Sequence, residues 1–305
     1  MTPIPSSLLS ARALRKFLPC IGVLIGLGSS SVAASPVPPP VTAVPETIRS
    51  QFKLDAFYTQ YLDLHGLPVV ASKRVRPEAL REAAWVLTNT FGHRPDIFAE
   101  LGRQNVRLAI IGYQERTTDI PEHSDLKPAA HWDRRARGLG PTPHRPAVSG
   151  AEENILCFKG DPYATENILI HEFAHAVHLM ALNKLDPTFD QRLKKAYDAA
   201  KAKNLWDSYA GSNKQEYWAE AVQSYINNNR ENDNQHNHVN TRSELKEYDP
   251  GVFALCKEIL GPNPPDYVKP WKRDLSTRKH LGPLLQSQLP TFSWDKRISA
   301  PTRSD

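Results

Sequence analysis

The strongest constraint on the fold is a long apolar segment in the middle of the chain. From residue 168 to residue 182 every position is apolar except for three histidines and one glutamate. Asp161 and Pro162, just ahead of this run, are residue types typical of the first positions of a helix. A helix that is apolar almost all round must be buried on most sides. The sequence therefore predicts a buried helix from Asp161 to Leu182.

Two histidines of this segment, His171 and His175, stand four residues apart, so a helix places both imidazoles on one face. At this spacing two ring nitrogens can share one tetrahedral Zn²⁺ ion. Glu172 lies about a hundred degrees round the helix axis, within reach of a water molecule that the metal would acidify. A helix that carries two histidines by chance is the alternative, but imidazole and carboxylate groups in so apolar a helix need partners. We therefore predict that His171 and His175 bind zinc and that Glu172 is the general base.

A catalytic zinc site needs a third ligand from the protein. The pattern that supplies a third histidine is excluded, because Ala181 stands where that histidine would be. The other common source is a glutamate from a later helix, and residues 213–225 place Glu216, Glu220 and Gln223 on one helical face. An amphipathic surface helix with a solvated acidic face would show the same pattern. From spacing alone, either Glu216 or Glu220 could be the third ligand.

The stretch 171–225 resembles the gluzincin peptidases of the anthrax lethal factor type. These combine His-Glu-Phe-x-His with a tyrosine that precedes, by seven residues, the first Glu of a Glu-aromatic-aromatic-Ala-Glu string. Here Tyr209 precedes Glu216 by seven, and Glu216 to Glu220 read Glu-Tyr-Trp-Ala-Glu. The family usually has Gly where Ala174 stands. The resemblance covers about 55 residues (171–225) and two motifs.

This resemblance implies that Glu216 is the third zinc ligand and that Tyr209 donates its hydroxyl to the oxyanion. It also implies that Glu220 does not bind the metal itself but accepts a hydrogen bond from one of the histidine ligands. For the fold, it implies a zincin-like α+β structure with a small mixed sheet and a central His-Glu-x-x-His helix. A strand expected at 154–158 would lie near the substrate.

The other histidines have less specific signals. His178 shares a face with His171 and His175 but lies about two turns beyond His171, ~10 Å along the axis. We expect it to be a core residue or a neighbour that supports the ligands. His236 and His238 lie in a polar, Asn-rich segment and are expected to be solvated.

The remaining pattern predicts strands first and helices afterwards, which is typical of the α+β class. Residues 119–150 are rich in Pro, Gly, His and Arg and are expected to form a long irregular loop, and residues 227–243 an exposed one. Helices are expected at 46–64, 77–90, 187–203, 212–227 and 251–260, and strands at 106–113 and 154–158.

Residues 1–34 have the order of a secretory signal peptide, with basic residues, a short apolar run and small residues before Ser35. We expect this segment to be followed by a Pro-rich linker (35–45), a single catalytic domain with an N-terminal helical part (46–290) and a polar tail (291–305). The mature protein is then secreted, to the periplasm or the cell exterior. Loss of residues 1–34 removes three positive charges and changes the net charge from +5 to +2.

Composition also indicates which classes of binding partner are expected. No Lys/Arg-rich tract interleaved with aromatic residues is present, so a nucleic-acid partner is not expected. No segment after the signal peptide is long and apolar enough to predict a membrane span. Cys157 and Cys256 remain after loss of the signal peptide, and in an oxidising compartment an isolated pair predicts a disulfide.

These patterns together predict a secreted zinc metallopeptidase, an endopeptidase acting on a peptide or protein substrate. Two alternatives stay open from the sequence. One is a catalytically silent zincin-fold protein that binds partners at the cell surface. The other is a zinc-dependent hydrolase of a non-peptide amide.

Overall fold

A computed structural model of the protein describes residues 37–294. The expected signal peptide and the end of the expected polar tail lie outside the described residues. Within the described range the chain contains one small mixed sheet and about eleven helices, so the expected α+β class is confirmed. The end of the expected Pro-rich linker forms a short edge strand, Thr42–Ala43.

The sheet has six strands within residues 37–294, in the order β1-β2-β3-β4-β6-β5. Their bounds are Thr42–Ala43 (β1), Gln60–Leu64 (β2), Leu67–Ala71 (β3), Arg107–Ile111 (β4), Gly138–Leu139 (β5) and Ala147–Ala151 (β6). The central pairs β3–β4 and β4–β6 are parallel, and the other pairs are antiparallel. The strand β5 therefore forms one edge of the sheet.

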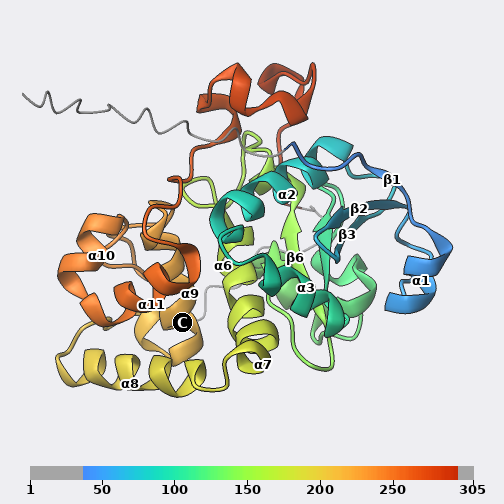
Figure 1. Cartoon of the computed structure of the whole chain (residues 1–305). Helices are drawn as coiled ribbons and strands as arrows, with labels where there is room; N and C mark the ends of the chain where they lie inside the picture. The colour runs from blue at the N-terminus through green and yellow to red at the C-terminus, as the bar shows by residue number, and fades with distance from the viewer. Residues whose placement is uncertain (1–36, 295–305) are drawn as a thin grey trace, which may run out of the picture. The chain divides into compact units, whose positions relative to one another are not determined.

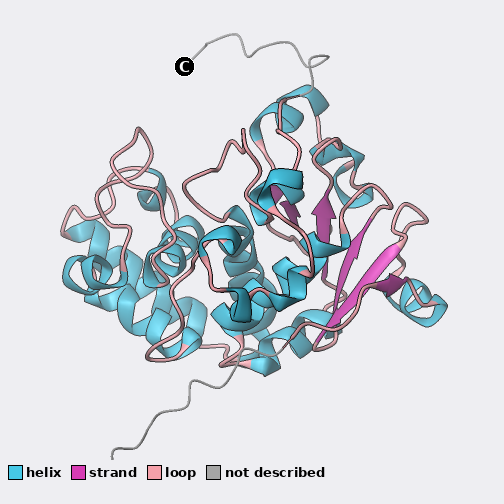
Figure 2. Cartoon of the chain, turned by 90° about the horizontal axis from the view of Figure 1, so that it is seen from above, coloured by secondary structure: helices cyan, strands magenta, loops and turns pink. Residues whose placement is uncertain are grey.

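The helices lie on two sides of a central one, α6 (Figure 1). Figure 2, seen from above, shows most of the helices grouped on one side of the strands. Their bounds are Glu46–Phe52 (α1), Pro77–Phe91 (α2), Pro95–Arg103 (α3), Ala129–Arg135 (α4), Glu152–Ile155 (α5), Ile168–Ala176 (α6), Asn183–Leu185 (α7), Phe189–Ala202 (α8), Lys214–Tyr225 (α9), Arg242–Tyr248 (α10) and Pro250–Leu260 (α11). In Figure 1, α8 to α11 lie on one side of α6, and the sheet with α2 and α3 lies on the other.

Alternation along the strands divides the core into two parts, because successive strand residues face opposite sides of a sheet. Leu108, Ile110 and Val148 face the larger cluster, which α2, α6 and α9 complete. Ala109 and Ile111 face a smaller cluster that is covered by the end of α1. Residues on both faces are fully buried, as a strand with near-continuous apolar sequence requires.

The helix α6 runs between the sheet and α9, and it contacts both β6 and α9. Gly150 of β6 permits the close approach of α6, since a Cβ atom there would lie only 3.2 Å from the Cβ of Leu169. Beyond Ala176 the helix continues as a π-helical turn, Val177–Leu182, and then as α7. The predicted central helix is therefore present, but it begins at Ile168 and not at Asp161.

The later start of α6 has a local cause in Asn154. Its side-chain amide donates to Asp161 Oδ2 and to the backbone carbonyl of Glu166, and its Oδ1 accepts from Ile168 N–H. These bonds hold residues 161–167 in turns ahead of the helix. The strand predicted at 154–158 is wrong, because the chain there ends the short helix α5 and then turns, and the strand precedes this helix as β6.

Two further expectations are corrected. The helix predicted over 46–64 ends at Phe52, and a β2–β3 hairpin follows, with His65 and Gly66 both at positive φ in a two-residue turn. Residues 119–150 are not a long irregular loop, since they contain α4, β5 and β6. The predicted strand at 106–113 and the helices at 77–90, 187–203, 212–227 and 251–260 are confirmed as β4, α2, α8, α9 and α11.

The predicted disulfide between Cys157 and Cys256 is wrong, because both thiols are free. Cys157 follows α5, with its Sγ 3.9 Å from the hydroxyl of Tyr267. Cys256 is buried in the larger core on α11. Burial raises the pKa of Cys157 to about 11 and that of Cys256 as well, so both side chains are held as thiols at neutral pH.

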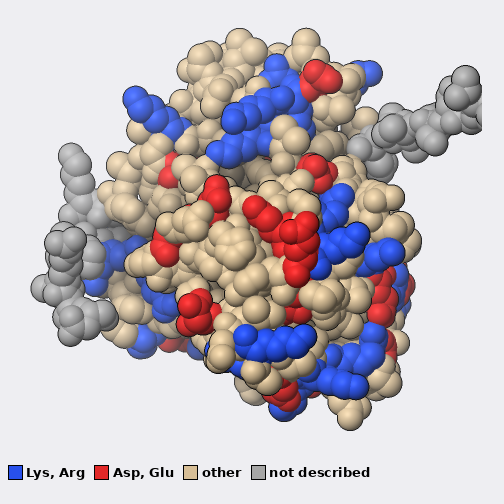
Figure 3. All heavy atoms as spheres, turned by 90° about the vertical axis from the view of Figure 1, so that its left-hand side faces the viewer, with Lys and Arg blue, Asp and Glu red and all other residues tan. Residues whose placement is uncertain are grey.

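Among residues 37–294, no helix has the length and apolar character that crossing a membrane requires. On the face shown in Figure 3, Lys and Arg side chains lie in several separate groups, with Asp and Glu side chains between them. This face therefore presents charges of both signs.

Candidate metal centre and active site

The centre is assembled by the two helices α6 and α9. His171 and His175 lie on successive turns of α6, and Glu216 lies in the first turn of α9. Asn213 caps α9, since its side chain accepts hydrogen bonds from the N–H groups of Gln215 and Glu216, both at 2.9 Å. This cap fixes the start of the helix at the point where the Glu216 carboxylate has to be placed.

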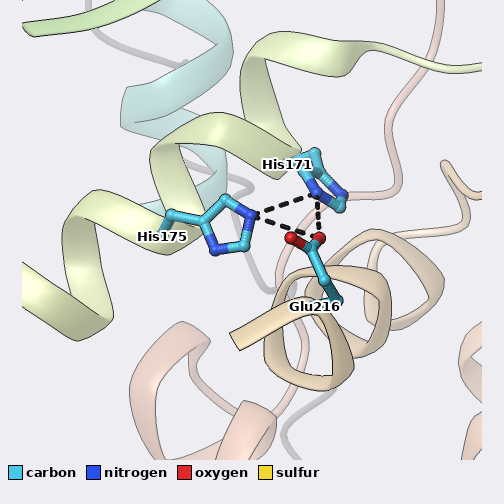
Figure 4. A group of neighbouring side chains, drawn as sticks. All are labelled: His171, His175 and Glu216. Carbon is cyan, nitrogen blue, oxygen red and sulfur yellow. Dashed lines mark hydrogen bonds and ion pairs between the residues drawn. The ribbon is translucent and has the colours of Figure 1, made fainter. Parts of the chain in front are cut away.

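The three predicted ligand side chains converge on one point (Figure 4). The Nε2 atom of His171 lies 3.0 Å from Oε2 of Glu216 and 3.2 Å from Nε2 of His175. The Nε2 atom of His175 lies 3.4 Å from the same Glu216 oxygen. A tetrahedral zinc ion with nitrogen and oxygen ligands at about 2.0–2.1 Å requires donor atoms about 3.4 Å apart. The observed triangle of donor atoms therefore fits such an ion.

Electrostatics at this point favour a cation. Burial lowers the pKa of His171, but the facing carboxylates of Glu216, Glu172 and Glu220 outweigh that effect and raise it to about 10. Burial raises the pKa of Glu216, but hydrogen bonds from His171 and His175 reverse the shift, so its pKa is lowered. The centre therefore attracts positive charge, which either protons on the imidazoles or a metal ion can supply.

Glu172 follows His171 on α6 and lies beside the edge strand. Gly140 lies close to its carboxylate, since a Cβ atom at Gly140 would be 3.4 Å from Glu172 Oε2 and 3.0 Å from the Cβ of His175. Burial raises the pKa of Glu172, and the neighbouring imidazoles lower it by a smaller amount. A carboxylate with a raised pKa is a better proton acceptor near neutral pH than an ordinary glutamate.

Tyr209 begins a short 3₁₀ turn, Tyr209–Gly211, that leads into α9. Its ring is nearly parallel to that of His171, with the centroids 6.1 Å apart. The phenol is half-buried, and burial together with the charge of Glu216 raises its pKa. Tyr209 therefore keeps its proton at neutral pH and can act as a hydrogen-bond donor inside the site.

These groups line a cavity of about 690 Å³. Its walls come from α4, β5, the turns before α6, α6 itself and the π-helical turn after it, the 3₁₀ turn Tyr209–Gly211, α9 and the loop that follows α9. They include Trp132, Leu139, Tyr163, Leu179, Tyr209 and His236. The edge strand β5 runs along the cavity, and a cavity of this size accommodates several substrate groups. The strand beside the site is thus β5, not the segment 154–158.

The predicted supporting residues have different positions. Glu220 is buried, and its Oε1 lies 3.5 Å from Nδ1 of His171. His178 is fully buried but points to Asp190, with its Nε2 2.9 Å from Oδ1 of that residue, and it is not among the residues lining the cavity. The structure therefore brings Glu220 to the centre and leaves His178 in the adjoining core.

Sequence reasoning missed three residues around the centre. Gln223 accepts a hydrogen bond from Nδ1 of His171 at 2.7 Å, and Glu166 accepts one from Gln223. His236 was expected to be solvated, but it is buried and its Nε2 lies 3.5 Å from Oε2 of Glu220. The signal for Gln223 was its place on the face of α9 that carries Glu216 and Glu220. For Glu166 and His236 no periodic signal exists, because both lie in irregular segments.

No protein-family model and no curated protein matches this chain.

Proposed function

We propose that this protein is a zinc-dependent hydrolase, and specifically an endopeptidase. The observation that carries the proposal is the triangle of His171 Nε2, His175 Nε2 and Glu216 Oε2, whose sides measure 3.0, 3.2 and 3.4 Å. These residues would hold the metal. Zinc bound by two imidazoles and a carboxylate acts as a Lewis acid that acidifies water and polarises a carbonyl group.

The side chains around the metal position would perform the proton transfers. Glu172 accepts a proton from water and returns it to the leaving amine, a role that its raised pKa supports. Tyr209 retains its proton and donates a hydrogen bond to the oxygen that becomes negative in the transition state. The absence of a side chain at Gly140 lets the wall lie close to His175 and Glu172, since a Cβ atom there would be 3.0 Å from the Cβ of His175.

The edge strand β5 supports a peptide substrate over other amides. It pairs with β6 and, within residues 37–294, has no strand on its other side. Gly138 and Leu139 of this strand line the cavity, and so does Gly140 directly after it. An extended peptide can pair with such an edge through its backbone, which places one of its amide bonds beside Glu172.

The motif resemblance supports assignment to the gluzincin peptidases of the lethal factor type, with a zincin-like fold. The order of residue types in 1–34 supports export, with a mature protein that begins near Ser35. N-terminal sequencing of the exported protein tests the second statement, since recovery of an intact N-terminus on a stable exported product would contradict it.

The proposed activity is tested with a peptide library digested by the purified protein and profiled by mass spectrometry. We expect cleavage at internal peptide bonds, loss of cleavage after chelation, and recovery when zinc is added back. His175→Ala should abolish cleavage, whereas His131→Ala, at an exposed position outside the cavity wall, should not. Zinc binding without cleavage of any peptide would contradict the endopeptidase assignment, and absence of zinc binding would contradict the metal site.

A further inference from the structure

A chain of polar groups leads from His171 through the buried Gln223 to Glu166 and Arg230, two residues of the cavity wall. Nδ1 of His171 lies 2.7 Å from Oε1 of Gln223, and Nε2 of Gln223 donates to Oε2 of Glu166 at 2.8 Å. Arg230 forms an ion pair with the other oxygen of Glu166 at 3.2 Å. Gln223 is completely buried and Glu166 is nearly so. We propose that this relay, Arg230–Glu166–Gln223, is what fixes the orientation and the protonated nitrogen of His171.

The direction of each hydrogen bond follows from the chemistry of the groups. An ionised carboxylate can only accept, so the amide NH₂ of Gln223 must face Glu166. The carbonyl oxygen of Gln223 then faces His171, and it too can only accept. Nδ1 of His171 must therefore carry a proton. In a neutral imidazole this leaves the lone pair on Nε2, the atom that faces His175 and Glu216.

The ionised state of Glu166 has support within the relay. Burial raises the pKa of this carboxyl overall, and the hydrogen bond from Gln223 and the charge of Arg230 offset part of that rise. Arg230 is itself held by Asp233, 3.4 Å away. The guanidinium thus supplies the positive charge that a buried carboxylate requires.

The motif resemblance implies that Glu220 accepts a hydrogen bond from a liganding histidine, but in the structure its carboxylate contacts other residues. Its Oε2 accepts a hydrogen bond from Asn229 at 2.8 Å and lies 3.5 Å from Nε2 of His236. Its Oε1 is 3.5 Å from Nδ1 of His171, compared with 2.7 Å for Gln223. Glu220 therefore holds the loop after α9, and Gln223 is the positioning residue for His171. This inference deepens the proposed function, because it concerns the ligand set of the proposed zinc site.

The inference is tested by zinc affinity and by the His171 Nδ1–H signal in NMR spectra of the full-length protein. Gln223→Met keeps the side-chain length but removes both hydrogen bonds. We expect zinc affinity, measured by competition with a chelator, to fall roughly ten- to a hundredfold. We also expect the Nδ1–H signal of His171, which a buried hydrogen bond protects from exchange with water, to disappear in this variant. Gln191→Met, an exposed position on α8, is the matched control and should change neither readout.

A second variant separates the relay from simple packing. Glu166→Gln keeps the volume but no longer dictates which end of the Gln223 amide faces His171, so zinc affinity should fall by a smaller factor. In a double variant the two losses should not add, because Glu166 acts only through Gln223. Should Gln223→Met fail to fold, the Glu166→Gln affinity alone decides the question, and an unchanged value overturns the relay.

The outcomes distinguish this inference from the proposed function. If the wild-type protein binds no zinc, the proposed function fails, and the protected Nδ1–H signal still tests the relay. If the wild-type protein binds zinc but Gln223→Met binds it equally well and keeps the signal, the relay is overturned and the zinc site stands.

Discussion

The indole Nε1–H of Trp218 donates a hydrogen bond to the backbone carbonyl of Ala174 at 3.0 Å. Ala174 lies between His171 and His175 on α6, and Trp218 lies two residues beyond Glu216 on α9. This one buried contact therefore joins the two helices at the level of the proposed ligands. The Trp218 ring also packs edge-on against Phe189 of α8, with centroids 5.1 Å apart.

Trp218→Phe should destabilise the protein and loosen the metal centre together. The variant loses a buried hydrogen bond, leaves part of the indole volume empty, and lowers the free energy of unfolding by roughly 1–3 kcal/mol. Urea unfolding followed by circular dichroism measures this change. Trp294→Phe, at a position where the side chain is exposed, is the control and should leave stability unchanged. Equal stabilities of the two variants would show that the contact does not hold α9 to α6.

Tyr209→Phe should leave zinc occupancy unchanged and reduce turnover by roughly ten- to a thousandfold, the range expected for one oxyanion donor. The ring packs at 6.1 Å from His171 in either case, so the substitution removes the hydroxyl and keeps the stacking. Steady-state kinetics on a cleaved library peptide gives the answer. An unchanged turnover rate would make Tyr209 a packing residue.

Cys157 and Cys256 should both be alkylated in denaturant without any reductant, because neither forms a disulfide. In the native protein alkylation should be slow at neutral pH, since burial raises the pKa of Cys157 to about 11 and keeps Cys256 a thiol. Intact-mass spectrometry counts the added groups. If modification in denaturant appeared only after reduction, the two cysteines would be bridged in solution.

Glu216→Ala should lose zinc on mild chelation, whereas Glu220→Ala should retain a measurable fraction. Glu216 Oε2 lies within 3.4 Å of both imidazole Nε2 atoms, but Glu220 approaches only the far nitrogen of His171. Removing a ligand costs most of the bound metal, whereas Glu220 holds the loop after α9 and its removal should cost at most about ten- to a hundredfold in affinity. Zinc content after dialysis against a chelator ranks the two variants. The reverse ranking would make Glu220 the third ligand.

The parts of the site that the sequence could predict are those with helical periodicity. The spacing of His171 and His175 places both on one face of a helix, and the same rule aligns Glu216, Glu220 and Gln223 on α9. Contact between these two helical faces depends on tertiary packing, which local periodicity does not encode. The seven-residue interval from Tyr209 to Glu216 suggested this contact only through the family resemblance. The arrangement of the proposed ligands was thus predictable in part, because each of the two helices carries its own local pattern.

The sequence predictions that the structure corrects failed for identifiable physical reasons. Phe57, Tyr61 and Leu64 fit a helical spacing, but the two-residue turn at His65–Gly66 makes the segment a hairpin, and a tight turn outweighs weak periodicity. The role of Glu166 depends on a glutamine 57 positions later in the chain. The polar loop after α9 was expected to be solvated because its composition is polar. It is instead tied to the site through buried hydrogen bonds of Asn229.

The central claim is that His171, His175 and Glu216 hold a zinc ion whose chemistry depends on Glu172. It is tested most directly by measuring zinc content and peptide cleavage on one preparation of Glu172→Gln. The amide fills the same space but cannot accept a proton. We predict about one zinc per chain, as in the wild type, with cleavage lowered by several orders of magnitude. Glu247→Gln, an exposed substitution on α10, should match the wild type in both. Near-native cleavage by Glu172→Gln, or absence of zinc from the wild-type protein, would contradict the account.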